Sequence, residues 1–248
     1  MIKISLLQMD IAWGNPQVNC QHAQKMIEDN PGSDVYVLPE MFSTGFATEP
    51  NGIAEKDLAS LDWMKSMATR HDAAICGSVA TEVDGEFRNR FYFVRPDGRV
   101  EHYDKHHLFT YGGEHKRYTR GDERVIVEFR GVRILLQVCY DLRFPVFARN
   151  HNDYDAIFYV ASWPTSRLEA WKTLLHARAI ENQCYVVGVD RCGNDPFCDY
   201  SGGTMLIDAY GRDVAVCDYG KECCVTAEID MEKLEAFRTK FPVLDDAD

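Results

Sequence analysis

The segment Val132-Arg-Ile-Leu-Leu-Gln-Val-Cys139-Tyr-Asp-Leu-Arg-Phe-Pro145 leads from a run of apolar residues directly to a thiol. The run up to Val138 is typical of a strand covered on both faces, and the residues after Cys139 predict a short helix. Val125-Ile-Val-Glu-Phe129 and a turn at Arg130-Gly131 come just before it, so we expect the two strands to form a hairpin. Cys139 is therefore expected where a buried strand gives way to a helix.

Strands and helices alternate on both sides of this hairpin. Further strands are expected at 2–9, 35–38, 73–83, 89–95, 155–161, 184–190, 203–208, 213–217 and 222–229, and one more from the Pro96-Asp-Gly98 turn to about Lys105. Helices are expected from an Asn15-Pro16 cap to about Asn30, at 54–71, at about 166–182 and from Met231 onward. Many strands and hairpins beside about five helices exclude an all-α bundle and a pure βαβ wheel. The pattern predicts a fold of mixed α+β and α/β character, with two packed mixed sheets and helices outside.

The composition is that of a well-packed enzyme, with 46% hydrophobic, 12% aromatic and 27% charged residues among 248. No repeat, low-complexity tract or linker interrupts the chain. We therefore expect a single domain over 1–248, with its core at about 2–235 and a C-terminal helix and tail at 231–248. The formal net charge of −12 argues against a nucleic-acid partner, and the lack of a polybasic cluster argues against binding to an anionic membrane.

The start of the chain and the cysteines predict a cytoplasmic protein. Residues 1–10 lack the basic region and long apolar stretch of a signal peptide, and no run approaches the ~18 apolar residues of a membrane span. The nine cysteines are odd in number and irregularly spaced, which fits reduced thiols better than a disulfide framework.

Three reactive side chains fall at the ends of predicted strands. Glu40 follows the strand at 35–38, Lys105 ends the strand after the Pro96-Asp-Gly98 turn, and Cys139 ends the apolar run from Val132. Taken singly, such a Glu is most often solvated, such a Lys faces solvent, and such a Cys is inert packing. Ligand sites, however, collect at the carboxyl ends of strands in open α/β structures. A carboxylate, an ammonium and a thiol together supply the base, the cation and the nucleophile of acyl transfer through a thioester.

The thiol needs help to react, because a thiol with a pKa of ~8.5 is only about 3% thiolate at neutral pH. A helix N-terminus and the Lys105 ammonium would both raise that fraction. Glu40 is placed to accept the thiol proton and later a proton from water.

Three separated motifs resemble the nitrilase superfamily of carbon–nitrogen hydrolases. They are Leu38-Pro-Glu40-Met-Phe, Tyr103-Asp-Lys105-His-His-Leu-Phe109 and Val138-Cys139-Tyr-Asp-Leu-Arg-Phe-Pro145. The resemblance covers nearly the whole chain, from Ile4 to the final residues. The segment after Cys139 is similar to the bacterial omega-amidase branch, as are three further stretches, Trp163-Pro, Leu175-His-Ala-Arg-Ala-Ile-Glu-Asn182 and the closing Phe241-Pro-Val-Leu-Asp-Asp-Ala-Asp248.

The resemblance implies a four-layer α-β-β-α sandwich, no metal or organic cofactor, and a homo-oligomer, a dimer or larger. It implies Cys139 as nucleophile, Glu40 as general base and Lys105 as oxyanion stabiliser and proton donor. Glu114 is expected to position Lys105 or the substrate. The implied reaction is hydrolysis of the terminal amide of short 2-oxo dicarboxylic acid monoamides, such as 2-oxoglutaramate and 2-oxosuccinamate, with release of ammonia.

Substrate-binding residues are expected beside these motifs. The Tyr140 N–H is a candidate donor to the oxyanion. A substrate carboxylate needs a cation, for which Arg143 is one candidate and Lys116, Arg117 and Arg167 are others. Arg143 is equally expected as a buried partner of Glu181. The aromatic residues expected to wall a small pocket, each of them also a plausible core residue, are Phe42, Phe109, Tyr111 and Trp163.

Three other interpretations compete with an omega-amidase. One is another amidase of the superfamily, acting on N-carbamoyl compounds or other small aliphatic amides, or a nitrilase, although the segment after Cys139 weighs against these. Another is a metal-binding module built from the following residues: His102, His106, His107, His115, Cys192, Cys198, Cys217, Cys223 and Cys224. Their spacing is wider or more irregular than that of zinc ligands. The third, an interaction protein without catalysis, is disfavoured because all four polar groups are present.

Overall fold

The computed structural model describes residues 1–246 and contains two six-stranded sheets. The first has the order β14 (Cys223–Ile229), β1 (Ile2–Gln8), β2 (Val35–Val37), β3 (Ala74–Val83), β4 (Glu86–Val94), β5 (Val100–Asp104). The second has the order β13 (Asp213–Val216), β12 (Met205–Ile207), β9 (Tyr185–Asp190), β8 (Ala156–Ala161), β7 (Val132–Val138), β6 (Ile126–Phe129). In each sheet three neighbouring strands are parallel and the others antiparallel, so both sheets are mixed.

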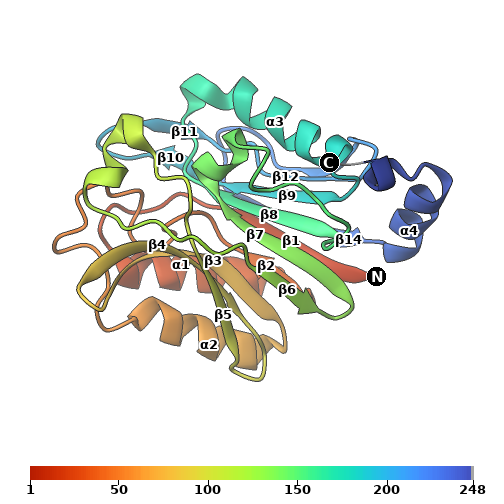
Figure 1. Cartoon of the computed structure of the whole chain (residues 1–248). Helices are drawn as coiled ribbons and strands as arrows, with labels where there is room; N and C mark the ends of the chain where they lie inside the picture. Colours follow the sequence, from red (N-terminus) through yellow and green to blue (C-terminus); the bar gives the residue numbers. More distant parts are fainter. Residues whose placement is uncertain (247–248) are drawn as a thin grey trace.

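Helices cover the outer faces of the two packed sheets (Figure 1). Helices α1 (Pro16–Asp29) and α2 (Ala59–His71) lie on the first sheet, and α3 (Leu168–Glu181) lies on the second. Helix α4 (Met231–Lys240) follows β14 near the end of the described chain. The four layers confirm the predicted α-β-β-α sandwich. Among residues 1–246, no helix has the length and apolar character that crossing a bilayer requires.

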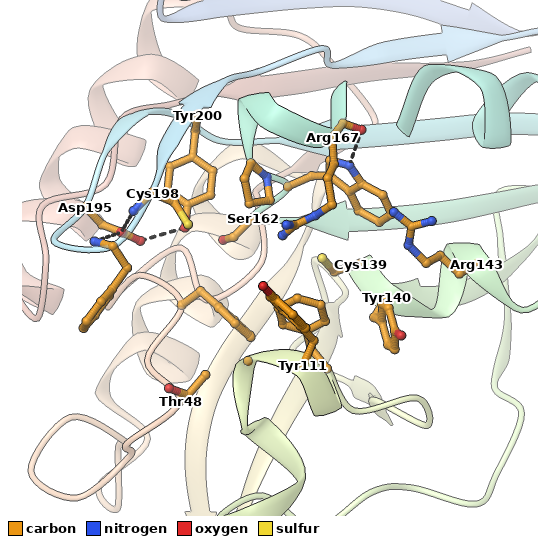
Figure 2. A pocket seen from close by; sticks show the side chains of 16 residues that line it. Thr48, Tyr111, Cys139, Tyr140, Arg143, Ser162, Arg167, Asp195, Cys198 and Tyr200 are labelled. Carbon is orange, nitrogen blue, oxygen red and sulfur yellow. Dashed lines mark hydrogen bonds between the residues drawn. The ribbon is translucent and has the colours of Figure 1, made fainter. Parts of the chain in front are cut away.

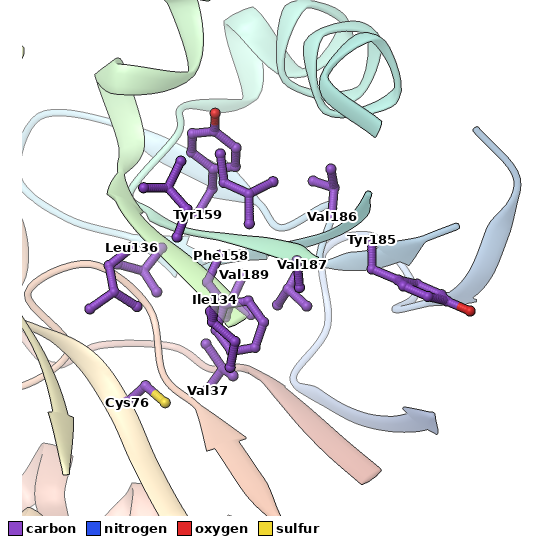
Figure 3. Close-up of a cluster of buried hydrophobic side chains, with 14 of the residues drawn as sticks. Val37, Cys76, Ile134, Leu136, Phe158, Tyr159, Tyr185, Val186, Val187 and Val189 are labelled. Atoms are coloured by element: carbon purple, nitrogen blue, oxygen red, sulfur yellow. The ribbon is translucent and has the colours of Figure 1, made fainter. Parts of the chain in front are cut away.

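Alternation along the strands divides the apolar residues between two clusters. Val35 and Val37 of β2 point into the space between the sheets, where Figure 3 shows Val37 and Cys76 opposite Ile134 of β7. Tyr36 points the other way and packs with residues of α1 and α2. Because side chains on successive strand residues face opposite sides, one short apolar run contributes to both clusters.

Most boundaries match the sequence-based expectation, and α2 is the clearest exception. Helix α1 begins as predicted, with the Asn15 side chain accepting a hydrogen bond from the Val18 N–H at 3.2 Å. Helix α2 begins at Ala59, whereas we expected a start at 54. Glu55 instead pairs along β3, donating its N–H to the Ala80 carbonyl at 2.9 Å. This pairing holds the chain extended before the helix.

Three further differences concern short elements. The helix expected after Cys139 is the 3-10 helix η3 (Cys139–Arg143), and the helix expected from 166 starts with the 3-10 turn η4 (Thr165–Arg167). A small hairpin of β10 (Cys192–Asn194) and β11 (Asp199–Ser201) was not predicted. The remaining 3-10 helices are η1 (Thr110–Gly112), η2 (Glu114–Lys116) and η5 (Val243–Asp246). The last two residues of the predicted tail, 247–248, lie outside the described residues.

The contact between α3 and β9 depends on the missing side chain of Gly188. A Cβ at this position would lie 2.5 Å from Leu175 Cδ1 and 3.0 Å from Trp171 Cζ2. We expect Gly188→Ala to lower the free energy of unfolding by about 1–3 kcal/mol through overpacking, measured by urea denaturation. In a Leu175→Ala background, which removes the clashing methyl groups, the same substitution should cost clearly less. An equal cost in both backgrounds would contradict this account of the packing.

Candidate active site

Four strands place their carboxyl ends at one edge of the sandwich. In the first sheet β2 and β5 run in the same direction, because β2 is parallel to β3 and two antiparallel pairings separate β3 from β5. Glu40 follows β2, and Lys105 follows β5 directly. In the second sheet β7 and β8 are parallel and are followed by Cys139 and Ser162. The three side chains predicted at strand ends therefore come together.

Lys105 lies between two carboxylates in the interior of this edge. Its Nζ donates to Glu40 Oε1 at 2.9 Å and to Glu114 Oε2 at 2.9 Å, and all three side chains are fully buried. The Phe46 ring lies on another side of the ammonium, 5.1 Å from Nζ to the ring centroid. The contact between Glu114 and Lys105 fits one of the two positioning roles expected of Glu114, which were to position Lys105 or the substrate.

Asn89, in the interior of β4, joins the two carboxylates, and the sequence analysis missed it. Its Nδ2 donates to Glu40 Oε1 at 2.8 Å and to Glu114 Oε1 at 3.1 Å. The Ser78 hydroxyl donates to Asn89 Oδ1 at 2.9 Å and so fixes the orientation of the amide. No strand end or motif marks this position. Only its interior-facing place in the sheet, next to the triad of Glu40, Lys105 and Cys139, shows that it joins the carboxylates.

Backbone N–H groups donate further hydrogen bonds to the carboxylates of Glu40 and Glu114. The Ser162 N–H donates to Glu40 Oε2 at 2.9 Å, and the Phe109 N–H donates to Glu114 Oε2 at 2.6 Å. Each carboxylate therefore accepts hydrogen bonds at both oxygens, as a buried charge requires.

The balance of charges decides the protonation of these groups. Burial alone would lower the pKa of Lys105, but Glu114 and Glu40 outweigh it and raise that pKa, so the side chain stays an ammonium. Burial, with the charge of Glu40, raises the pKa of Glu114 even though Lys105 lowers it. One buried cation therefore faces two carboxylates that compete for it.

Cys139 lies beside this group in a constrained backbone. Its φ is +45°, in the left-handed region that a non-glycine residue rarely adopts, and the residue is 9% exposed. Burial and the Glu40 charge raise the pKa of the thiol, and Lys105 and the Ser162 N–H lower it by less. The expected gain in thiolate from Lys105 is thus outweighed. Cys139 is therefore a neutral thiol at rest, and the Glu40 carboxylate lies beside it.

The thiol opens onto a cavity of about 290 Å³ (Figure 2). The lining residues are Phe46, Thr48, Phe109, Tyr111, Gly112, Cys139, Tyr140, Arg143, Ser162, Trp163, Pro164, Arg167, Asp195, Phe197, Cys198 and Tyr200. Of the predicted aromatic wall, Phe109, Tyr111 and Trp163 are present. The expectation for Phe42 is wrong, because its ring is in the core next to Trp63 of α2, 5.6 Å between centroids, and Phe46 lines the cavity in its place.

Two guanidinium groups lie in the wall of this cavity. Arg143 lies over the Trp163 ring at 4.9 Å and Arg167 over the Phe109 ring at 5.4 Å. Figure 2 shows the Arg167 guanidinium turned toward the space between Ser162 and Cys139. Among residues 1–246, neither guanidinium has an acidic partner. The cavity therefore offers positive charge to an anion.

The expected partner of Arg143 and the other two candidate cations lie elsewhere. Glu181 pairs with Arg178 at 2.8 Å, so the expected pairing of Arg143 with Glu181 is wrong. Arg117 pairs with Glu49 at 3.0 Å, and neither it nor Lys116 lines the cavity.

The β10–β11 hairpin supplies the cavity wall that the sequence analysis did not foresee. Its turn carries Asp195, whose side chain is 1% exposed and accepts from the Tyr200 hydroxyl at 2.7 Å. The Arg191 guanidinium lies 3.8 Å from the same carboxylate. Since Asp195 is already paired, it does not cancel the charge of Arg143 and Arg167.

Two histidines of the metal-binding alternative, His106 and His107, lie side by side with ring centroids 4.6 Å apart. Their Nδ1 atoms have different partners, the Gly121 carbonyl for His106 and Asp141 for His107. His106 stacks on Phe147 and His107 on Phe144, with centroids 4.1 and 4.0 Å apart. His102 lies beside Tyr92. In the part of the chain that the structure describes, no three His, Cys, Asp or Glu side chains form a group suited to a metal ion.

The chain is similar to known proteins in sequence and in fold. The chain is 46% identical to a protein named omega-amidase YafV from Yersinia enterocolitica, over 100% of this chain and 97% of that protein. It is 38% identical to 2-oxoglutaramate amidase of Bacillus subtilis, over 98% and 96%. XC1258 from Xanthomonas campestris, described as a CN-hydrolase superfamily protein with an arsenic adduct in the active site, superimposes with a TM-score of 0.97 at 41% identity, covering 100% and 97%.

The family description matches residues 3–239, which is nearly the whole chain. The predicted resemblance to the nitrilase superfamily and its omega-amidase branch, and the predicted hydrolase class, are confirmed. The protein belongs to the carbon-nitrogen hydrolase family.

Proposed function

We propose that the protein hydrolyses the terminal amide of short 2-oxo dicarboxylic acid monoamides, 2-oxoglutaramate and 2-oxosuccinamate among them, to the 2-oxo acid and ammonia. The observation that carries this proposal is one cavity lined both by Cys139 and by two guanidiniums that have no acidic partner among residues 1–246. Glu40 and Lys105 lie buried beside Cys139. The names of the relatives, omega-amidase and 2-oxoglutaramate amidase, support the same substrate class.

Acylation begins with transfer of the Cys139 proton to Glu40. The sulfur attacks the amide carbon and forms a tetrahedral intermediate with a negatively charged oxygen. Lys105 has three N–H groups and donates hydrogen bonds to two carboxylates, so one N–H remains for this oxygen. The Tyr140 N–H is the second donor to the oxygen. One such donor typically lowers the barrier by ~3–4 kcal/mol. Glu40 returns its proton to the nitrogen, ammonia leaves, and a thioester on Cys139 remains.

Deacylation uses the same carboxylate in the reverse sense. Glu40 takes a proton from water, the hydroxide attacks the thioester carbon, and the carbon–sulfur bond breaks. The proton on Glu40 then returns to the Cys139 sulfur. Each cycle consumes one water and restores the resting protonation of both side chains.

Arg143 and Arg167 provide the site for the substrate carboxylate in this proposal. A carboxylate beside a guanidinium forms charge-assisted hydrogen bonds, which the triad end of the cavity cannot offer because it is negatively charged. An N-carbamoyl compound also carries a carboxylate. The sequence after Cys139 and the names of the relatives weigh against that alternative and against neutral aliphatic amides.

We also propose a domain organisation, a cellular location and an assembly state for the protein. We propose one catalytic domain over the chain, which the pairing of β1 with β14 supports because it joins both ends of the sequence in one sheet. A cytoplasmic setting is supported by nine free cysteines. Assembly into a homo-oligomer rests on the resemblance to the superfamily.

Cys139→Ala should lower ammonia release from 2-oxoglutaramate by at least about 10⁴-fold, because the nucleophile is gone. Wild-type protein quenched during turnover should carry the acyl mass on the peptide that contains Cys139. Cys223→Ala, which removes a thiol of β14 outside the cavity lining, serves as the control. Retained activity in Cys139→Ala, or an acyl group on another residue, would rule out the proposal.

Glu40→Gln should lower turnover and, at the same time, make the Cys139 thiol easier to ionise. Turnover should fall at least about 100-fold, since the base is lost. The pKa of Cys139 should fall as well, because the Glu40 charge and hydrogen bond that raise it are removed while Lys105 stays. The thiolate absorbance of this variant, corrected with Glu40→Gln/Cys139→Ala, should therefore appear at lower pH than in the wild type. A higher pKa in the variant would contradict the electrostatic account.

Arg167→Gln should lower kcat/KM for 2-oxoglutaramate by at least about tenfold, because a partly buried charge pair with the substrate is lost. Pentanamide, a neutral amide of the same length, should be hydrolysed slowly by the wild type and lose less than about twofold in the variant. Arg117→Gln is the matched control, since Arg117 lies outside the cavity and pairs with Glu49. Equal losses on the charged and neutral amides would show that Arg167 does not recognise the carboxylate.

A further inference from the structure

Asp141, two residues after the nucleophile, is a fully buried carboxylate with four hydrogen bonds. Its Oδ2 accepts from the Tyr103 hydroxyl at 2.8 Å and from the Val138 N–H at 2.9 Å. Its Oδ1 accepts from the His107 N–H at 2.8 Å and from His107 Nδ1 at 2.9 Å. Two bonds at each oxygen compensate the cost of burying the charge.

These four donors come from two segments of the chain. One segment carries Lys105 and the other carries Cys139. Tyr103 and His107 lie two residues before and two residues after Lys105, at the end of β5 in the first sheet. Val138 ends β7 in the second sheet and immediately precedes Cys139. Asp141 therefore links the segment that holds the ammonium to the turn that holds the sulfur.

The imidazole ring of His107 provides one of the side-chain donors to Asp141. A carboxylate only accepts hydrogen bonds, so His107 Nδ1 carries the proton in this contact. The ring is held in place by Phe144, with centroids 4.0 Å apart and an angle of 10° between the planes. Within residues 1–246, the hydrogen bonds of His107 go to Asp141 and not to Glu40, Glu114 or Lys105. His107 thus acts on the site through Asp141.

We propose that His107 is a positioning residue of the reaction: through Asp141 it fixes the Cys139 turn relative to Lys105. This inference rests on the proposed chemistry at Cys139. The backbone of Cys139 supplies the reason that positioning is needed, because its φ of +45° persists only where the surroundings hold the turn. Asp141 holds it by accepting the N–H of Val138, the residue before the strained one. When His107 Nδ1 is removed, Oδ1 keeps only the His107 backbone N–H, so Asp141 and the turn attached to it are held by three hydrogen bonds in place of four.

The test compares two substitutions that separate the ring from its N–H. His107→Phe keeps a ring against Phe144 and removes the donor, and His107→Asn loses the stacking but places an amide N–H where Nδ1 stood. His107→Phe should lower kcat about 10- to 100-fold, the range expected for a small misplacement of reacting atoms, and leave KM within about twofold. His107→Asn should recover most of the lost kcat. His106→Phe is the matched control, because His106 is the adjacent ring and its Nδ1 contacts the Gly121 carbonyl at 2.6 Å instead of Asp141.

A second readout keeps the inference separate from the identity of the substrate. Alkylation of Cys139 by chloroacetamide requires a well-placed thiol but no amide cleavage, so it should slow in His107→Phe by a factor similar to that for kcat. If wild-type protein failed on 2-oxo monoamides while this difference persisted, the proposed substrate would be wrong and the positioning role would stand. Unchanged kcat and alkylation in His107→Phe, or an Asn variant no better than the Phe variant, would overturn it.

Discussion

The ion pair between Lys105 and its two carboxylates is the constraint on which the rest of the site depends. A fully buried ammonium costs several kcal/mol in lost hydration, and only close, well-oriented counter-charges offset that cost. Glu40 and Glu114 meet this need from two different segments, at 2.9 Å each. Strands β3 and β4 separate β2 from β5 in the first sheet. The residues that follow β2 must therefore bring Glu40 across to Lys105, and the loop after Lys105 must fold back so that Glu114 returns to it.

In the proposed mechanism, the same charges explain why the Cys139 thiol needs a base. Two carboxylates share one cation, so the interior holds an excess of negative charge. Burial, together with the charge of Glu40, raises the pKa of Glu114 and of Cys139. A thiolate beside Glu40 would add a second uncompensated anion. In that mechanism, moving the thiol proton to Glu40 creates the thiolate without changing the total charge, and Lys105 would then stabilise the sulfur and the developing oxyanion. The arrangement therefore favours a Cys139 thiolate that forms during the reaction over a thiolate that is present at rest.

The fold and the reactive groups could be predicted from the sequence to different depths. Cys139, Lys105 and Glu40 stand at strand ends, and strand ends are visible in the pattern of apolar residues, so their meeting was predictable. Asn89 sits inside a strand and Asp195 inside a hairpin that no apolar run marks, so their roles depend on which strands pair and how a turn folds over the cavity. Phe42 and Phe46 are four residues apart, and the packing of α2 against the first sheet, which no local pattern encodes, decides which ring faces the core.

The distribution of charge across the cavity also orients the substrate. The chain has a net charge of −12, and the triad end of the cavity adds buried negative charge, so a substrate anion is repelled from most of the molecule. Arg143 and Arg167 form the positive part of the wall, since Asp195 is held by Tyr200 and Arg191. A monoamide with one carboxylate then has one favourable direction, with its anionic end at the guanidiniums and its neutral amide at Cys139. The reversed direction would place its carboxylate against Glu40 and Glu114. In the proposed function, the unequal charge at the two ends of one cavity thus directs the substrate carboxylate to the guanidiniums and the amide to Cys139.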